Sequence, residues 1–63
     1  MNVGDTVTVR VHDGRDCAAT VVATYEGEPD VLDVQVGALK PLKRLARAAD
    51  IGNPTPFTWR PIA

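Results

Sequence analysis

The sequence contains no serine, a single cysteine and a single histidine, and these shortages exclude several kinds of site. Without serine there is no serine nucleophile of the kind that many hydrolases use. With Cys17 as the only thiol, the chain can form neither an intrachain disulfide nor a zinc site with two cysteines. We therefore exclude the small disulfide-stabilised secreted domains and expect a reducing compartment.

Long hydrophobic runs are also missing. No stretch approaches the roughly 18 consecutive apolar residues that a membrane-spanning helix requires. The first residues, MNVGDTVTV, have neither a basic region nor a continuous apolar run, so no signal peptide is expected. The sequence predicts a cytoplasmic protein that makes no contact with a membrane.

The chain has 63 residues, 44% of them apolar, which predicts one domain spanning residues 1–63. A domain of this size buries only about 60% of the surface that its unfolded chain exposes, so each large core side chain matters. Large rings are scarce, because the only aromatic residues are Tyr25, Phe57 and Trp59. Two of these three rings lie in the segment FTWRP, residues 57–61.

Alternation of apolar and polar residues predicts three strands. Residues 5–11 place valines on one face and polar residues on the other, and the Asp13-Gly14 pair that follows predicts a hairpin turn. Residues 17–25 are apolar on both faces, which is typical of a strand buried where a small barrel curls over itself. After a predicted loop at residues 26–30, residues 31–36 alternate again, with Leu32, Val34 and Val36 inward and Asp33 and Gln35 outward.

Residues 41–49 have a different period. Leu42, Leu45, Ala46 and Ala49 recur at helical spacing, and the basic residues of the segment fall on the opposite face. This pattern favours a short helix, with Pro41 in its first turn, over the fourth strand that a closed barrel would need. Residues 50–56 contain two prolines and a Gly-Asn pair, and are predicted to form a loop.

The tail FTWRP has two interpretations. As a last strand it would place Phe57 and Trp59 on one face, and their rings would fill a core otherwise made of small aliphatic side chains. As an exposed segment it would be a partner contact, because Trp and Arg are enriched in such contacts. We favour core closure, and we retain Phe57, Trp59 and Arg60 as candidate partner-binding residues.

Short motifs along most of the chain resemble a known group. A GD-V start, an A-T-V second strand, an LDV third strand and a TW-x-P end occur here as Gly4, Asp5, Val7; Ala19, Thr20, Val21; Leu32, Asp33, Val34; and Thr58, Trp59, Pro61. This order resembles small uncharacterised proteins of tailed phages and prophages that have an SH3-like β-barrel. The resemblance implies a mainly β fold of about five short antiparallel strands. It also implies a phage setting, in which the protein would occupy the host cytoplasm or the virion, but it implies no mechanism.

Candidate catalytic and metal sites are sparse. Cys17 and His12 flank the predicted turn and could form a nucleophilic pair, but the sequence offers no group that would orient the imidazole. His12, Asp13 and Asp16 provide too few oxygen ligands for a hard cation. We therefore predict no enzyme, no metal and no cofactor.

The charges are divided unequally between the two halves of the chain. Residues 1–36 carry most of the acidic side chains, whereas the later residues are basic, although the net charge of the whole chain is only −1. Either the halves pair in the fold, which we favour, or they form separate surfaces. In the second case Lys40, Lys43, Arg44 and Arg47 could contact phosphates while Trp59 stacks on a base.

These observations predict a non-enzymatic protein-interaction module, with an accessory role in a virion or its assembly. Its partner would be another protein or a second copy of the chain. The alternative is a small nucleic-acid-binding module. Against that alternative, the calculated pI is about 5.6, whereas dedicated nucleic-acid-binding domains are usually basic overall.

Overall fold

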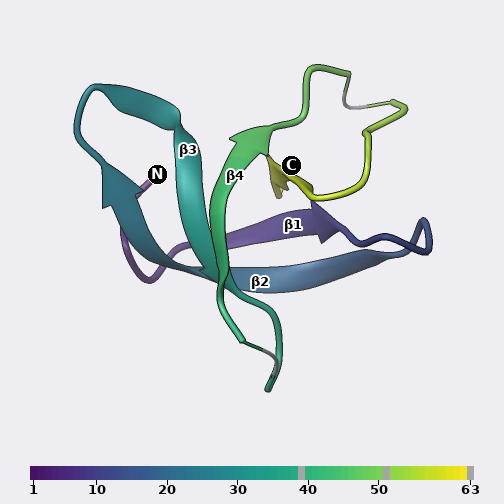
Figure 1. The fold of residues 1–63 in the computed structure, drawn as a ribbon, viewed down its shortest axis with the longest axis horizontal. Helices are drawn as coiled ribbons and strands as arrows, with labels where there is room; N and C mark the ends of the chain where they lie inside the picture. Colours follow the sequence, from purple (N-terminus) through teal and green to yellow (C-terminus); the bar gives the residue numbers. More distant parts are fainter. Residues whose placement is uncertain (39, 51, 63) are drawn as a thin grey trace.

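The computed structural model describes residues 1–38, 40–50 and 52–62. In these ranges the chain forms five strands and no helix: β1 (Thr6–Arg10), β2 (Asp16–Tyr25), β3 (Glu28–Gln35), β4 (Leu42–Arg47) and β5 (Thr58–Pro61). Each strand pairs with the next, and β5 returns to pair with β1, so the sheet closes into a barrel (Figure 1). The predicted fold class, a small β-barrel of about five strands, is confirmed, and its strand order is consistent with the SH3-like kind.

One strand pair departs from the antiparallel arrangement that was predicted. β4 and β5 run parallel, with Ala46 opposite Thr58 and Arg47 opposite Trp59, while the other four pairs are antiparallel. The cause is parity. In a closed ring of five strands the directions cannot alternate all the way round, so at least one pair must be parallel.

The helix predicted near residues 41–49 is wrong, because residues 42–47 form β4. Leu42 lies opposite Val34 and Leu45 lies opposite Leu32, so three steps along β4 match two steps along β3. This is a β-bulge, in which one extra residue is inserted into a strand. The insertion turns both leucines inward at a spacing of three, and so produces the pattern that resembles a helix.

Two other predictions for the barrel wall are wrong. β2 is buried on one face only: Ala19 and Val21 face the core, whereas Val22 is 42% exposed, because no element in the described ranges covers the outer surface of the sheet there. The loop predicted at residues 26–30 is shorter than expected. Tyr25 pairs with Glu28, so the connection is a tight turn at Glu26-Gly27.

Trp59 lies in the core, as favoured from the sequence. Only 2% of its surface is exposed, and its indole N–H donates a hydrogen bond to the carbonyl oxygen of Asp30 at 2.9 Å. The ring packs in a cluster with eight aliphatic residues: Val7, Val9, Ala19, Val21, Leu32, Val34, Val36 and Leu45. The expectation that Phe57 shares this face is wrong, because β5 begins only at Thr58 and Phe57 is 49% exposed.

No helix able to span a bilayer occurs in the ranges that the structure describes.

Candidate functional site

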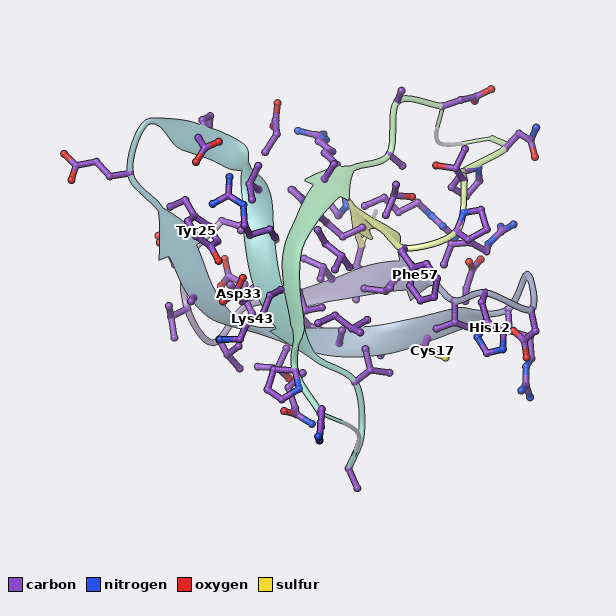
Figure 2. The ribbon with its side chains drawn as sticks, viewed as in Figure 1. His12, Cys17, Tyr25, Asp33, Lys43 and Phe57 are labelled. Carbon is purple, nitrogen blue, oxygen red and sulfur yellow. The ribbon has the colours of Figure 1, made fainter. Side chains whose placement is uncertain are left out.

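A pocket of about 240 Å³ lies beside the β1–β2 hairpin. It is lined by an apolar set and by a polar set of side chains: Val11, Cys17, Val36, Leu42 and Phe57, and His12, Asp13 and Arg15. His12 and Cys17 flank the hairpin turn, and Phe57 joins them there from a distant part of the chain (Figure 2). We refer to this site as the His12–Phe57 pocket.

The hairpin places His12 at the pocket, which the sequence did not predict. The amide of Gly14 donates to the carbonyl of Val11 at 3.0 Å, and Gly14 adopts a φ of 86°, which glycine tolerates without a Cβ clash. The Asp13 carboxylate accepts the amide of Arg15 at 3.1 Å and closes the turn. The predicted turn at Asp13-Gly14 is therefore confirmed.

Phe57 reaches the pocket through an unusual backbone conformation. Its φ is 60°, in the left-handed region that bulky residues rarely adopt, and its amide donates to the carbonyl of Arg10 at 2.7 Å. The ring stacks on the imidazole of His12, with centroids 6.3 Å apart and planes inclined by 17°. Half of the Phe57 side chain nevertheless remains exposed to solvent.

Two carboxylates near the hairpin are neutralised by arginines. Asp13 pairs with Arg15 at 2.6 Å, and this hydrogen bond lowers the pKa of Asp13 and raises that of Arg15. Asp16 lies between Arg60 and Arg10, each with a nitrogen 2.6 Å from a carboxylate oxygen. Hydrogen bonds from these two guanidinium groups hold the pKa of Asp16 well below its usual range.

The structure brings Cys17 and His12 to the same pocket, but it does not arrange them as a catalytic pair. Among the described residues, the imidazole has no hydrogen bond to the thiol or to an orienting carboxylate. A thiol nucleophile needs a base within hydrogen-bonding reach. In the same ranges, no group of three or more His, Cys, Asp or Glu side chains is placed to hold a metal ion.

A second polar cluster was not predicted from the sequence. Asp33 was expected to face solvent, but it is only 8% exposed, and a single oxygen accepts the hydroxyl of Tyr25 at 2.6 Å and the amide of Arg44 at 2.8 Å. These two hydrogen bonds lower the pKa of Asp33 and the first raises the pKa of Tyr25. Figure 2 shows Asp33 between Tyr25 and Lys43. Because the amide of Arg44 belongs to the bulge, we interpret the cluster as structural.

The basic residues of β4 are largely engaged by the acidic half of the chain. The guanidinium of Arg44 lies 4.7 Å from the centroid of the Tyr25 ring and 3.3 Å from the Glu28 carboxylate. The guanidinium of Arg47 lies 5.5 Å from the centroid of the Trp59 ring and 3.9 Å from Asp30. Together with the Arg60–Asp16 pair, these contacts show that the two halves of the chain pair with each other.

The candidate residues for nucleic-acid binding therefore differ in their surroundings. Lys40 and Lys43 are exposed and make no ion pair with any residue that the structure describes. Arg44 and Arg47 are exposed but paired, and the ring of Trp59 is buried. The stacking surface expected of Trp59 is thus not available to a base.

Comparison with protein-family models, with curated proteins and with solved structures finds no match for this chain. The resemblance to small phage and prophage proteins stays a prediction.

Proposed function

We propose that this protein is a non-enzymatic protein-interaction module whose contact site is the His12–Phe57 pocket. The observation that carries the proposal is the conformation of Phe57. Its aromatic side chain is held half exposed, over an apolar pocket, by a left-handed backbone.

This conformation is unfavourable for folding. A left-handed residue with a Cβ costs roughly 1–2 kcal/mol, and a domain of this size has a total stability on the order of 3–9 kcal/mol. Strained residues concentrate at sites of function, where the surrounding structure maintains them. An exposed phenylalanine contributes little to the core, so the strain is better explained by a contact with a partner.

The size of the pocket supports a non-enzymatic function. At about 240 Å³ it is smaller than the roughly 300–1,000 Å³ of small-molecule sites, and it is large enough for one side chain of a partner. The resemblance to phage proteins supports an accessory role in a virion or its assembly. The partner would be either a different protein or a second copy of this chain.

The alternative, nucleic-acid binding, is favoured by one observation: Lys40 and Lys43 are exposed and unpaired among the described residues. Two cations without a stacking ring predict weak contact with phosphates that disappears as salt is raised. An apolar contact at Phe57 depends much less on salt. The two proposals therefore differ in a quantity that can be measured.

The test compares Phe57→Ala with Ile62→Ala, which removes another exposed apolar side chain that does not line the pocket. Self-association is followed by sedimentation, and binding of a purified partner by calorimetry, each at two salt concentrations. We expect Phe57→Ala to weaken the contact at least tenfold and Ile62→Ala to leave it unchanged. A single-stranded oligonucleotide is titrated in the same way, and its binding should be absent; oligonucleotide binding that survives Phe57→Ala but is lost in Lys40→Gln/Lys43→Gln, with steep salt dependence, would instead support the nucleic-acid alternative.

A further inference from the structure

The His12–Phe57 pocket has a projecting aromatic ring at its own border. Phe57 lines the pocket and is nevertheless 49% exposed. Of the three aromatic side chains in the sequence, Trp59 is buried and Tyr25 is half-buried, so only Phe57 presents a largely exposed ring. One patch of the surface therefore combines an apolar hollow with an apolar group of the kind that could fill it.

This combination is what contact between two copies of the same chain requires. About a two-fold axis both subunits use the same patch, so a projecting group and the hollow that accepts it must lie side by side. Phe57 supplies the projecting ring, and Val11, Val36 and Leu42 supply aliphatic walls for the hollow. A different partner would need only one of these two features.

The charged side chains at the pocket are also self-complementary. Those that line it are Asp13 and Arg15, which pair with each other at 2.6 Å and together carry no net charge. The pocket therefore selects neither an acidic nor a basic partner. Arg15 is 82% exposed, and its guanidinium has five N–H donors, of which Asp13 uses only some. In a two-fold pair the remaining donors can meet Asp13 of the other copy.

The net charge of the whole chain does not oppose such a pair. A large net charge keeps copies of a protein apart, whereas a net charge near zero favours association. This chain has a net charge of only −1. Repulsion between two copies is therefore weak, and the apolar contact at Phe57 decides whether they associate.

We propose that two copies of the chain associate about a two-fold axis, with Phe57 of each copy inserted into the His12–Phe57 pocket of the other and Arg15 of each beside Asp13 of the other. This inference rests on the proposed function and commits it to a second copy as the partner. The rings of His12 and Phe57, inclined by only 17°, provide flat surfaces on which an inserted ring can stack.

The contact is expected to be weak. Eight residues line the pocket, whereas each side of a stable protein interface contributes about 20–30 residues. We therefore expect a dissociation constant on the order of 100 μM. The protein would be mainly monomeric at about 10 μM and mainly dimeric at about 1 mM, and these two concentrations define the experiment.

The first measurement is sedimentation equilibrium between these two concentrations, combined with NMR of the 15N-labelled protein. The mass should rise from that of one chain toward that of two and go no further, because a two-fold contact closes on itself. Amide shifts that depend on concentration should be largest at Val11, Val36, Leu42 and Phe57. They should be small at Val22, which is exposed on the outer surface of β2.

Cys17 provides an independent readout of the same face. It is the only thiol in the chain, it lines the pocket and it is half-buried. An inserted Phe57 ring would cover it. The rate constant for its alkylation by N-ethylmaleimide, an uncharged reagent, should therefore be severalfold lower at about 1 mM protein than at about 10 μM.

Two substitutions of Phe57 test the inserted ring. Phe57→Ala should weaken dimerisation at least tenfold and make Cys17 equally reactive at both concentrations. Phe57→Gly should do the same, and its fold is secure because glycine adopts the φ of 60° without strain. Val22→Thr is the matched control, since it alters another exposed apolar side chain that does not line the pocket, and it should leave dimerisation unchanged.

A mixing experiment tests the charged pair. Asp13→Asn keeps a side-chain oxygen for the amide of Arg15 and leaves the arginine charge uncompensated, whereas Arg15→Gln leaves the carboxylate charge uncompensated. Each variant alone places like charges opposite each other across the axis. A mixture of the two places opposite charges there, so it should associate severalfold more tightly at low salt than either variant alone. A mixture that associates no more tightly would overturn the Arg15–Asp13 contact.

The remaining failures are distinguishable. A protein that stays monomeric at about 1 mM, with Cys17 equally reactive at both concentrations, would overturn the second copy as partner while leaving the proposed contact site open to other proteins. Dimerisation that survives both Phe57 variants, with Cys17 equally reactive in the dimer, would contradict both the inference and the contact site. Loss of dimerisation in Val22→Thr alone would assign the contact to the outer surface of β2 and would also overturn the inference.

Discussion

One carboxylate oxygen of Asp33 accepts the main-chain amide of Arg44 at 2.8 Å, directly across the irregular step in the β3–β4 pairing. A bulge leaves a residue without its regular ladder partner, and a buried unpaired amide is unfavourable. Asp33 supplies the missing acceptor. Leu42 and Leu45 can therefore both face the core, because Asp33 on the neighbouring strand satisfies the amide of Arg44, one of the two residues between them.

Removal of this acceptor should destabilise the barrel. We expect Asp33→Ala to lower the free energy of unfolding by about 1–3 kcal/mol, because the amide of Arg44 and the hydroxyl of Tyr25 both lose their partner. Asp33→Asn should cost less, since its carbonyl oxygen can still accept. Urea denaturation measures the difference, with Asp30→Asn as the control because the Asp30 side chain is 68% exposed. Equal stability of Asp33→Ala and the control would contradict this role for Asp33.

Tyr25 reports on the same cluster through its ionisation. The hydrogen bond to the Asp33 carboxylate raises the pKa of Tyr25 above its ordinary value of 10.0. Because Tyr25 is the only tyrosine, a spectrophotometric titration assigns its pKa without ambiguity. In Asp33→Asn the negative neighbour is gone, so the pKa should move back toward 10.0. An unchanged pKa in that variant would mean that the hydroxyl is not bonded to Asp33 in solution.

Acid should unfold the protein through carboxylates whose pKa is lower in the folded state than in the unfolded state. Hydrogen bonds from Arg60 and Arg10 lower the pKa of Asp16, and those from Tyr25 and Arg44 lower that of Asp33. Their contribution to stability is complete above the unfolded pKa near 3.8 and is lost as the pH falls through the folded values. Chemical denaturation from pH 6 to pH 2 should show this loss. In Asp16→Asn the free energy of unfolding should depend less steeply on pH over the same range.

The left-handed backbone conformation of Arg44 in β4 predicts an unusual order of stability among variants at this position. Arg44 has a φ of 53°, which glycine adopts freely and β-branched residues resist. In Arg44→Gly the relief of strain offsets the lost contacts with Tyr25 and Glu28, so stability should change by less than about 1 kcal/mol. Arg44→Val should be less stable than Arg44→Gly by about 1–3 kcal/mol. Thermal unfolding of both variants decides the order, and a valine variant as stable as the glycine variant would contradict it.

Trp59 and Phe57 should differ sharply in solvent exposure and in their contribution to stability, although only one residue separates them. Trp59 is 2% exposed, so its fluorescence should be blue-shifted and protected from iodide at every protein concentration. Trp59→Ala should lose about 3–5 kcal/mol and Phe57→Ala less than about 1 kcal/mol. Emission spectra and urea denaturation test both statements. Red-shifted emission from a dilute sample would show that the tail leaves the core.

Much of the barrel could be predicted from the sequence because its strands obey local rules. The alternation in residues 5–11 and the Asp13-Gly14 turn each depend on neighbouring residues, and both predictions hold. Residues 42–47 could not be assigned correctly, because the bulge depends on Asp33, which belongs to another strand. One inserted residue changes a spacing of two into a spacing of three, and the spacing alone does not distinguish this from a helical turn.

The candidate site was less predictable than the fold. His12 and Cys17 were noticed because they flank one turn, but Phe57 joins them only through the pairing of β5 with β1. Its left-handed conformation, which keeps the ring out of the core, leaves no local signal in FTWRP. The segment instead suggested two rings on one face. The neutralisation of Arg44 and Arg47 likewise depends on the register between β3 and β4.

The position of Trp59 in the last strand has a consequence for how the protein is made. β1 is synthesised first, but one of its two neighbours is β5, and the largest core side chain arrives with β5. Until β5 has been synthesised and is free to pair with β1, the barrel cannot close and the valines of the earlier strands have no indole to pack against. Chains arrested before that point lack both the barrel closure and the indole, and would be substrates for chaperones or proteases rather than partly active domains.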